Sequence, residues 1–157
     1  MEKIIKYMKE ALKEAKKAEL IDEVPIGCVI VKDDKIIARG HNQRETKQSP
    51  IGHAEIIAIN KASKKLKSWR LEGCDIYVTL EPCIMCSGAI IQSRINKVYY
   101  GASDPKGGAL GSSINVLEAN NINHHPEVIS GVLKEECSSI ITNYFKAKRQ
   151  SKWQTWT

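Results

Sequence analysis

The first forty residues change from a helical to a strand-like pattern of apolar positions. Residues from about 3 to 18 fit an amphipathic helix, because apolar side chains recur at helical spacing at Ile4, Ile5, Met8, Leu12 and Ala15. Residues 26–31 are continuously apolar and lie between turn-forming residues, which predicts a buried strand. Asp33 and Asp34 then fit a two-residue turn, and residues 35–39 fit the second strand of a hairpin.

After a polar loop over residues 41–52, helices and strands alternate. The pattern predicts two helices, over about 53–66 and 83–93, and two strands, over 75–80 and 98–101. A strand, a helix and a strand in this order favour parallel strands joined by a right-handed crossover. Ligands of such sheets gather beyond the carboxyl ends of the strands. Cys83 and Cys86 fall at that position in this sequence.

The last third of the chain is less regular. Residues 102–113 are rich in glycine and hold Asp104 and Lys106, which is typical of a functional loop. Residues 120–126 are polar and irregular, and a last helix is expected over about 133–148. A chain of 157 residues suits one core, and the sequence has no internal repeat. We therefore expect a single domain over residues 1–157, with a basic C-terminal helix and tail from about residue 133.

The predicted helix over 83–93 is apolar on nearly all sides. Its apolar residues are Ile84, Met85, Ala89, Ile90 and Ile91. A helix of this kind must be covered on two sides, and one small sheet covers only one of them. The pattern therefore predicts a subunit interface on this helix, and with it a homodimer.

Composition restricts where this protein works and what it binds. Hydrophobic residues make up 42% and charged residues 27%, as in an ordinary soluble globular protein. No stretch is long and apolar enough to cross a membrane, and the first residues begin a polar helix rather than a signal peptide. We expect a reducing cytoplasm, with Cys28, Cys74 and Cys137 as small core residues. The net charge of +6 and the pI near 9.0 permit a polyanionic partner without demanding one.

Two short motifs carry the candidate chemistry. His53-Ala54-Glu55 begins one predicted helix, and Cys83 and Cys86 lie at the start of another. Zinc prefers thiolate and imidazole ligands in a tetrahedron, and a catalytic site leaves the fourth position to water. A helix N-terminus also favours the thiolate form of cysteine. We interpret His53, Cys83 and Cys86 as ligands of one zinc ion per subunit, with Glu55 beside the water.

Each motif alone has a simpler interpretation. A lone Cys-x-x-Cys can be a redox pair or two packed cysteines, and a structural zinc site would need a fourth ligand. His41 is near in sequence, but it ends a predicted strand and lacks ligand spacing. The joint pattern of His-x-Glu followed by Pro-Cys-x-x-Cys is much more specific. It is the known signature of the zinc-dependent nucleobase deaminases.

Longer stretches narrow this resemblance to one family. The run from Thr79 to Ile90, followed by Ser93-Arg94-Ile95, strongly resembles the bacterial tRNA-specific adenosine deaminases. So do residues 23–27, Asn42 at the end of a strand, and residues 101–107. The resemblance extends from the first helix to about Arg149.

The resemblance implies a fold, a reaction and a partner. The fold is the three-layer α/β/α arrangement of the cytidine deaminases, with a five-stranded mixed sheet flanked by helices, assembled as a homodimer. The reaction is zinc-dependent hydrolysis of adenosine to inosine at the wobble position of the anticodon of an arginine tRNA. The partner is the anticodon stem-loop of that tRNA, and no protein partner other than a second copy is implied.

The resemblance also assigns roles to single residues. It gives His53, Cys83 and Cys86 as the zinc ligands and Glu55 as the proton shuttle. It makes Asn42 and the backbone of Ala54 contacts to the adenine. The expected contacts to neighbouring nucleotides or the anticodon loop are Asp104, Lys106, Asn143, Phe145 and Arg149.

The chain departs from the family before His53 and after Arg149. The family usually has Asp-Pro-Thr-Ala where this chain has Ser-Pro-Ile-Gly at residues 49–52, and the tail over 151–157, with Trp153 and Trp156, has no counterpart. Two rival functions remain at this point. One is a deaminase of a free base or nucleotide, such as a guanine or cytosine compound, on the same fold. The other is a non-catalytic zinc or RNA-binding module, which would give Glu55 no role.

Overall fold

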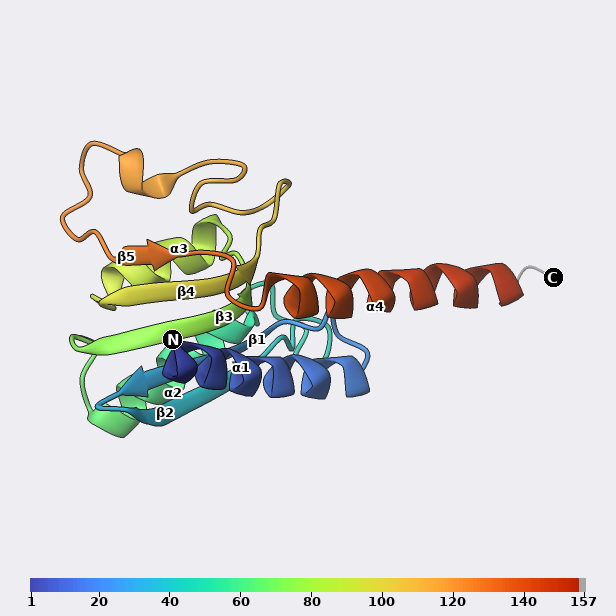
Figure 1. Ribbon diagram of the computed structural model, residues 1–157, viewed down its shortest axis with the longest axis horizontal. Coiled ribbons are helices and arrows are strands. Elements are labelled where there is room, and N and C mark those ends of the chain that lie inside the picture. The colour runs from blue at the N-terminus through green and yellow to red at the C-terminus, as the bar shows by residue number, and fades with distance from the viewer. Residues whose placement is uncertain (156–157) are drawn as a thin grey trace.

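The computed structural model describes the backbone of residues 1–155 and the side chains of residues 1–151 (Figure 1). A five-stranded mixed sheet lies between helices, which confirms the predicted α/β fold class. The elements in chain order are α1 (Glu2–Leu20), β1 (Gly27–Lys32), β2 (Lys35–His41), α2 (Ala54–Leu66), β3 (Cys74–Leu80), α3 (Ile84–Gln92), β4 (Lys97–Ala102), the 3₁₀ turn η1 (Val116–Glu118), β5 (Glu127–Ile129) and α4 (Lys134–Thr155). The side chains of Trp153 and Trp156 lie outside the described residues.

The strands are arranged in the order β2-β1-β3-β4-β5. β1 pairs antiparallel with β2 and with β3, whereas β3, β4 and β5 run parallel. The parallel pair β3–β4, joined through α3, confirms the predicted crossover. The apolar pattern did not predict β5, because three residues are too few to show a period.

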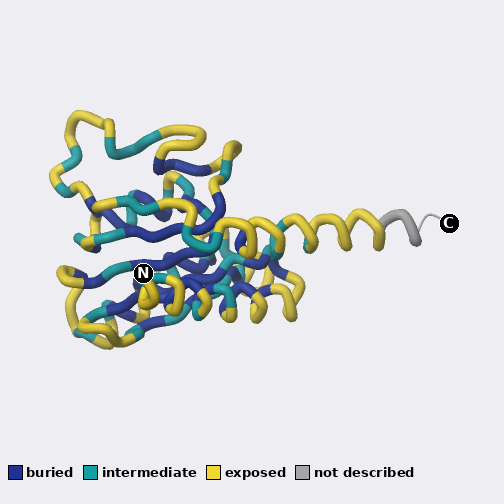
Figure 2. Tube along the Cα trace, in the orientation of Figure 1, coloured by how far each residue is buried: buried dark blue, intermediate teal, exposed yellow. Residues whose placement is uncertain are grey.

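Alternation along the strands produces two cores, one on each face of the sheet. Cys28 and Ile30 of β1 pack with α2 and α3, whereas Val29 and Val31 pack with α1. Figure 2 shows the buried strands in the middle of the molecule and the exposed outer sides of the helices. The period of two in β1 thus decides which helices cover which face.

Three predicted local features are present in the structure. Asp33 and Asp34 form the turn between β1 and β2, with φ of 50° and 60°. Both angles are left-handed, as a tight hairpin turn of this length requires. The last helix begins where expected but continues to Thr155, beyond the predicted end near residue 148. Three further cysteines are buried in the core as expected, namely Cys28, Cys74 and Cys137.

α3 leaves part of its apolar surface uncovered in the single chain. Cys86, Ser87, Ile90 and Ile91 are buried, whereas Ile84 is 63% exposed. This exposure agrees with the reason given for a homodimer, and the homodimer itself stays a prediction. Among the described residues, no helix combines the length and apolar character needed to span a membrane.

Candidate active site

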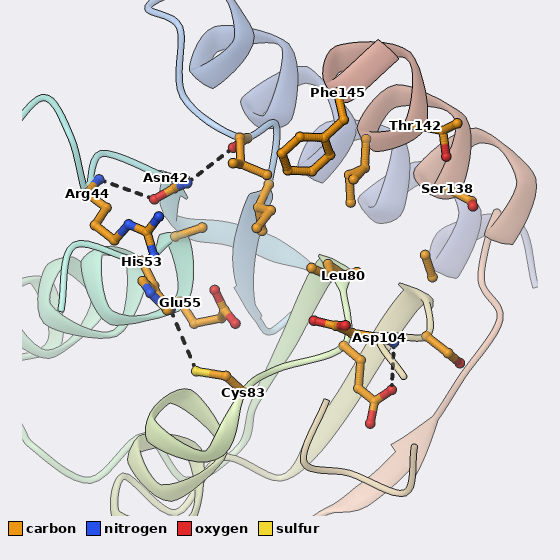
Figure 3. Close-up of a pocket in the computed structure, with 17 residues that line it drawn as sticks. Asn42, Arg44, His53, Glu55, Leu80, Cys83, Asp104, Ser138, Thr142 and Phe145 are labelled. Atoms are coloured by element: carbon orange, nitrogen blue, oxygen red, sulfur yellow. Dashed lines mark hydrogen bonds between the residues drawn. The ribbon is translucent and has the colours of Figure 1, made fainter. Parts of the chain in front are cut away.

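The starts of α2 and α3 bring the two sequence motifs together. His53 and Cys83 are the N-cap residues of these helices, and both have extended backbone angles. An N-cap residue has its backbone outside the helix while its side chain lies near the first turn. Figure 3 shows His53 and Glu55 beside Cys83 at the bottom of a cavity. The structure therefore places residues about thirty positions apart in the sequence at one point.

The three candidate ligands have the spacing of a tetrahedral zinc site. His53 Nδ1 lies 3.7 Å from Cys83 Sγ and 3.5 Å from Cys86 Sγ. Zinc bonds of roughly 2.3 Å to sulfur and 2.0–2.1 Å to nitrogen would place nitrogen and sulfur roughly 3.6 Å apart. Within the described part of the chain, only these three His, Cys, Asp or Glu residues form a group with metal-ligand spacing. The donor set thus fits zinc and leaves the fourth position for water.

The electrostatics of this group favour the metal-binding form of one residue, Cys83. A hydrogen bond with Cys86, and the nearby ring of His53, lower the pKa of Cys83 to about 3 despite its partial burial. The hydrogen bond with Cys83 raises the pKa of His53. The hydrogen bond between Cys83 and Cys86, together with burial, raises the pKa of Cys86. Cys83 is therefore a thiolate, which is the form of cysteine that binds a metal.

Glu55 is a buried carboxyl group in the first turn of α2. It is 4% exposed, and burial raises its pKa from the ordinary 4.5 to about 7, with the nearby Cys83 charge acting in the same direction. A carboxyl group with a pKa near neutrality can both accept and donate a proton at neutral pH. A cation held by the three ligands would lower that pKa again. The burial and raised pKa of Glu55 are compatible with a group that exchanges protons.

A cavity of about 390 Å³ opens above this cluster. Four more of the predicted contact residues line it, namely Asn42, Ala54, Asp104 and Phe145. They come from four separate segments of the chain, as Figure 3 shows for the three that it labels. The other three predicted contact residues do not line the cavity. They are exposed on segments that also supply lining residues: Lys106 on the 103–107 loop, and Asn143 and Arg149 on α4.

Asn42 is held in one orientation by its neighbours. Its side-chain oxygen accepts from the backbone N–H of Arg44 at 3.2 Å, and its amide nitrogen donates to the carbonyl of Val24 at 3.3 Å. The residue is 7% exposed. An amide nitrogen has two N–H groups, so one remains for a molecule in the cavity. The two hydrogen bonds therefore fix the direction of the remaining Asn42 N–H group before any ligand binds.

The opposite wall of the cavity depends on Glu81, a residue that the sequence did not single out. Its carboxylate accepts backbone N–H groups of Asp104 at 3.1 Å, Leu110 at 3.0 Å and Ser112 at 3.2 Å, and it also accepts the Ser112 hydroxyl. Gly108 packs so closely that a Cβ there would overlap the Glu81 carboxylate. Burial would raise the pKa of Glu81, but these donors together lower it. Glu81 thus folds the glycine-rich loop against the cavity.

Glu23 has the same role for the loop before His53. It is 2% exposed and accepts the backbone N–H of Glu45 at 3.1 Å and of Thr46 at 2.6 Å, together with the Thr46 hydroxyl at 2.6 Å. Burial opposes ionisation, yet the donors lower the pKa of Glu23. The available signal was an acidic residue directly before the apolar segment over residues 24–31.

The comparisons with known proteins agree with this geometry. A family model described as MafB19-like deaminase matches residues 2–149. A tRNA-specific adenosine deaminase of Bacillus subtilis is 56% identical over 93% of this chain and 91% of its own length. The chain belongs to the tRNA-specific adenosine deaminase family. A structure from a study of A-to-I editing by tRNA:A34 deaminases at the wobble position of transfer RNA matches with a TM-score of 0.83 and 46% identity, covering 85% of this chain and 97% of the other.

A deaminase of a free base shares the same fold. The structure of a guanine deaminase from Bacillus subtilis matches with a TM-score of 0.60 and 32% identity, covering 73% of this chain and 84% of the other. The deaminase family is therefore established for this chain, while its fold also occurs with a free-base substrate. The choice between substrates must come from the cavity and its surroundings.

The departure from the family pattern before His53 has a local structural consequence. Gly52 stands where the family usually has Ala, and a Cβ here would lie 3.3 Å from backbone atoms of Gln43 and Arg44. The Gln43 N–H donates to the Gly52 carbonyl at 2.9 Å. The loop therefore closes more tightly beside Arg44 than an alanine would permit without a shift of a few tenths of an ångström.

Proposed function

We propose that this protein is a zinc-dependent hydrolase that converts adenosine to inosine at the wobble position of the anticodon of an arginine tRNA. The observation that carries the proposal is the convergence of His53, Cys83 and Cys86 beside the buried Glu55, at the bottom of a cavity. Family membership supports the deamination of adenosine in a tRNA, since a relative at 56% identity is named a tRNA-specific adenosine deaminase. The balanced reaction consumes one water and releases one ammonia.

In the proposed mechanism Glu55 moves the protons. His53, Cys83 and Cys86 would hold the zinc, which would supply a water with a pKa lowered towards neutrality. Glu55 accepts a proton from the attacking water, and the water oxygen bonds to carbon 6 of the purine. Glu55 then returns the proton to the ring nitrogen, and a further transfer to the amino group lets ammonia leave. A carboxyl group whose pKa is raised by burial suits this exchange.

The substrate must be unstacked before it can enter. A stacked base hides the atom under attack, and anticodon loops present unpaired bases that can turn outward. In the proposal the adenine meets the Asn42 amide and the Ala54 backbone, both in the cavity wall. Asp104, Lys106, Asn143, Phe145 and Arg149 are the proposed contacts to the flanking nucleotides.

The surroundings of the cavity favour an RNA over a free base. Phe145, on α4, lines the cavity and is 43% exposed, so a base has an aromatic face available at the rim. α4 continues past it with exposed Lys146, Lys148 and Arg149. A free base of the guanine class would need neither feature. The proposal also includes a homodimer that acts in the cytoplasm, where its tRNA substrate is found.

One comparison of substrates tests the proposal. Single-turnover inosine formation is measured on an anticodon stem-loop, with free adenosine, guanine and cytidine as parallel substrates. We expect conversion of the stem-loop alone. Deamination of a free base at a comparable rate, with the stem-loop unchanged, would contradict the RNA assignment. Metal analysis of Cys86→Ala complements the assay, since full zinc content in that variant would remove Cys86 from the ligand set.

A further inference from the structure

Asp22 lies at the end of α1 in a backbone conformation that few residues adopt. Its φ is 59°, and its N–H donates to the Glu19 carbonyl at 3.0 Å while the next N–H, of Glu23, donates to Ala18 at 2.9 Å. These bonds close the C-terminus of α1 through one left-handed residue. Asp and Asn tolerate this region better than other residues with a side chain. The backbone therefore aims the Asp22 side chain in a fixed direction, away from α1.

That side chain reaches across to α4. Asp22 Oδ2 accepts from Lys148 Nζ at 2.6 Å, and Oδ1 accepts from the Tyr144 hydroxyl at 3.0 Å. The same hydroxyl lies 3.2 Å from the Asp22 carbonyl oxygen. Residues 122 and 126 positions apart in the sequence are thus joined by hydrogen bonds on the surface.

Few of the described side chains of α4 are buried against the rest of the protein. Among its described side chains only Cys137, in the first turn, is fully buried. Tyr144 lies seven residues further, which is roughly 10 Å along a helix axis. Phe145 packs edge-on against Tyr144 with ring centroids 5.4 Å apart and lines the cavity. The position of Phe145 over the cavity therefore depends on how Tyr144 is held.

The two residues after Asp22 hold the other side of the opening. Glu23 binds the loop at Glu45 and Thr46, and the Val24 carbonyl accepts from Asn42. A second hollow of about 660 Å³ lies between these walls and adjoins the cavity through Val24, Asn42, Arg44 and Phe145. Asp22, Tyr144 and Lys148 line this second hollow. Residues 22–24 thus connect both walls of the opening.

We propose that Asp22 is a positioning residue for RNA binding, which fixes α4 and Phe145 relative to the cavity through Tyr144 and Lys148. The inference rests on the proposed function and adds a role for an acidic residue that touches no substrate atom. It also changes the interpretation of Lys148. Although this lysine belongs to the basic surface of α4, its ammonium group is engaged with Asp22 and acts as an attachment rather than as a phosphate contact.

Removal of the Asp22 side chain should change RNA affinity in opposite directions under two explanations, a purely electrostatic role and a positioning role. Asp22 places a negative charge beside the proposed path of a polyanion, so its removal by electrostatics alone would tighten RNA binding. If Asp22 positions α4, its removal loosens the helix and weakens binding. Asp22→Gly is the suitable variant, because glycine adopts the positive φ without strain while the side-chain bonds are lost.

The turn between β1 and β2, which contacts the start of α1, offers a matched control. Asp34 also has a positive φ, of 60°, and its carboxylate pairs with Lys3 at 3.0 Å. Its carbonyl accepts from the Tyr7 hydroxyl at 2.8 Å. The two aspartates are similarly exposed, at 67% and 69% of the side chain. Asp34→Gly therefore removes the same kind of bond with the same backbone freedom, in the hairpin turn between β1 and β2.

The decisive measurement is the Kd of an anticodon stem-loop at several salt concentrations. We expect Asp22→Gly and Tyr144→Phe to weaken binding, by roughly two- to fivefold for Asp22→Gly, in line with an exposed ion pair. The slope of affinity against salt and the single-turnover rate at saturating stem-loop should change little. Asp34→Gly should bind as the parent does. Unchanged or tighter binding by Asp22→Gly would overturn the proposal.

Lys148→Ala separates the two interpretations of the lysine. As an attachment to Asp22, its loss weakens binding no more than Asp22→Gly does, because the bond from Tyr144 to Asp22 remains. The double variant should then bind as Asp22→Gly does, with an unchanged salt slope. As a phosphate contact, its loss would reduce the salt slope by roughly 0.7–1 and would add to the effect of Asp22→Gly. The second result would overturn the proposal.

Hydrogen exchange tests the attachment without any RNA. Amide protection over residues 138–151 should fall in Asp22→Gly and stay unchanged in Asp34→Gly. Equal protection in both variants would overturn the attachment of α4. If the parent protein fails to bind the stem-loop, the proposed function fails, whereas the exchange result still decides whether Asp22 holds α4.

Discussion

Glu55 and Glu81 are two buried glutamates beside the same cavity, and their surroundings are opposite. Glu81 is 2% exposed and accepts four hydrogen bonds from the 104–112 loop, which lower its pKa although burial opposes this. Glu55 is 4% exposed, and its burial raises its pKa to about 7. Burial alone therefore does not decide what a carboxyl group does. The hydrogen-bond donors around each carboxyl group decide whether its pKa is raised or lowered, and the raised pKa of Glu55 suits the proposed proton exchange.

The largest expected effect is a loss of catalytic activity on substitution of Glu55. Glu55→Gln preserves volume but cannot accept and return protons, so inosine formation should fall roughly 10²–10⁴-fold or more. Zinc content, melting temperature and stem-loop binding should stay near those of the parent. Single-turnover assays on the stem-loop measure the rate. Activity within tenfold of the parent would contradict the role of Glu55.

The next largest effect is a loss of stability on substitution of Glu81, compared with the same substitution of Glu55. In Glu81→Gln an amide N–H₂ replaces one acceptor oxygen and faces backbone donors that then lack a partner. We expect a loss of about 2–4 kcal/mol in the free energy of unfolding, since each unsatisfied buried donor costs about 1–3 kcal/mol. Urea titration of Glu81→Gln beside Glu55→Gln measures this difference. Equal stability of the two variants would show that the four bonds do not hold the loop.

The smallest effect is a pH dependence of that stability difference. The pKa of Glu81 is below its ordinary value of 4.5 in the folded protein, so the folded state favours the ionised form. Its contribution is fully present above about pH 4.5 and is lost as the pH falls through the lower folded value. The gap in unfolding free energy between the parent and Glu81→Gln should therefore narrow below about pH 4.5. A gap that stays constant from pH 6 to pH 3.5 would argue against an ionised Glu81.

The sequence was sufficient for features that depend on local order. The first helix, α1, was readable from an apolar period over several turns, and β1 from a continuous apolar run between turn-forming residues. The candidate ligands were readable because His53 and the two cysteines lie at helix starts within short motifs. In each case the necessary residues are neighbours, or the motif itself specifies the spacing.

The features that escaped prediction depend on distant partners. Glu81 holds residues 23 to 31 positions away, and Asp22 holds Tyr144 at a separation of 122. Such pairs leave no period in the sequence, because a single polar residue meets a single partner only after the sheet has formed. The strand β5 escaped prediction for the same reason. Its three residues pair with β4, so their position depends on the finished edge of the sheet.

The placement of the ligands at two helix starts also affects how the chain folds. His53 and Cys83 are separated by 30 residues, a segment that contains α2 and β3. Closing a loop of that length costs an unfolded chain roughly 3 kcal/mol of conformational entropy beyond a length-independent term. A zinc ion bound to both residues, as proposed, would act as a cross-link across this loop, one that a chelator could remove and added metal could restore. Metal concentration would then be a variable of the folding equilibrium, because affinity for the folded state adds directly to its stability.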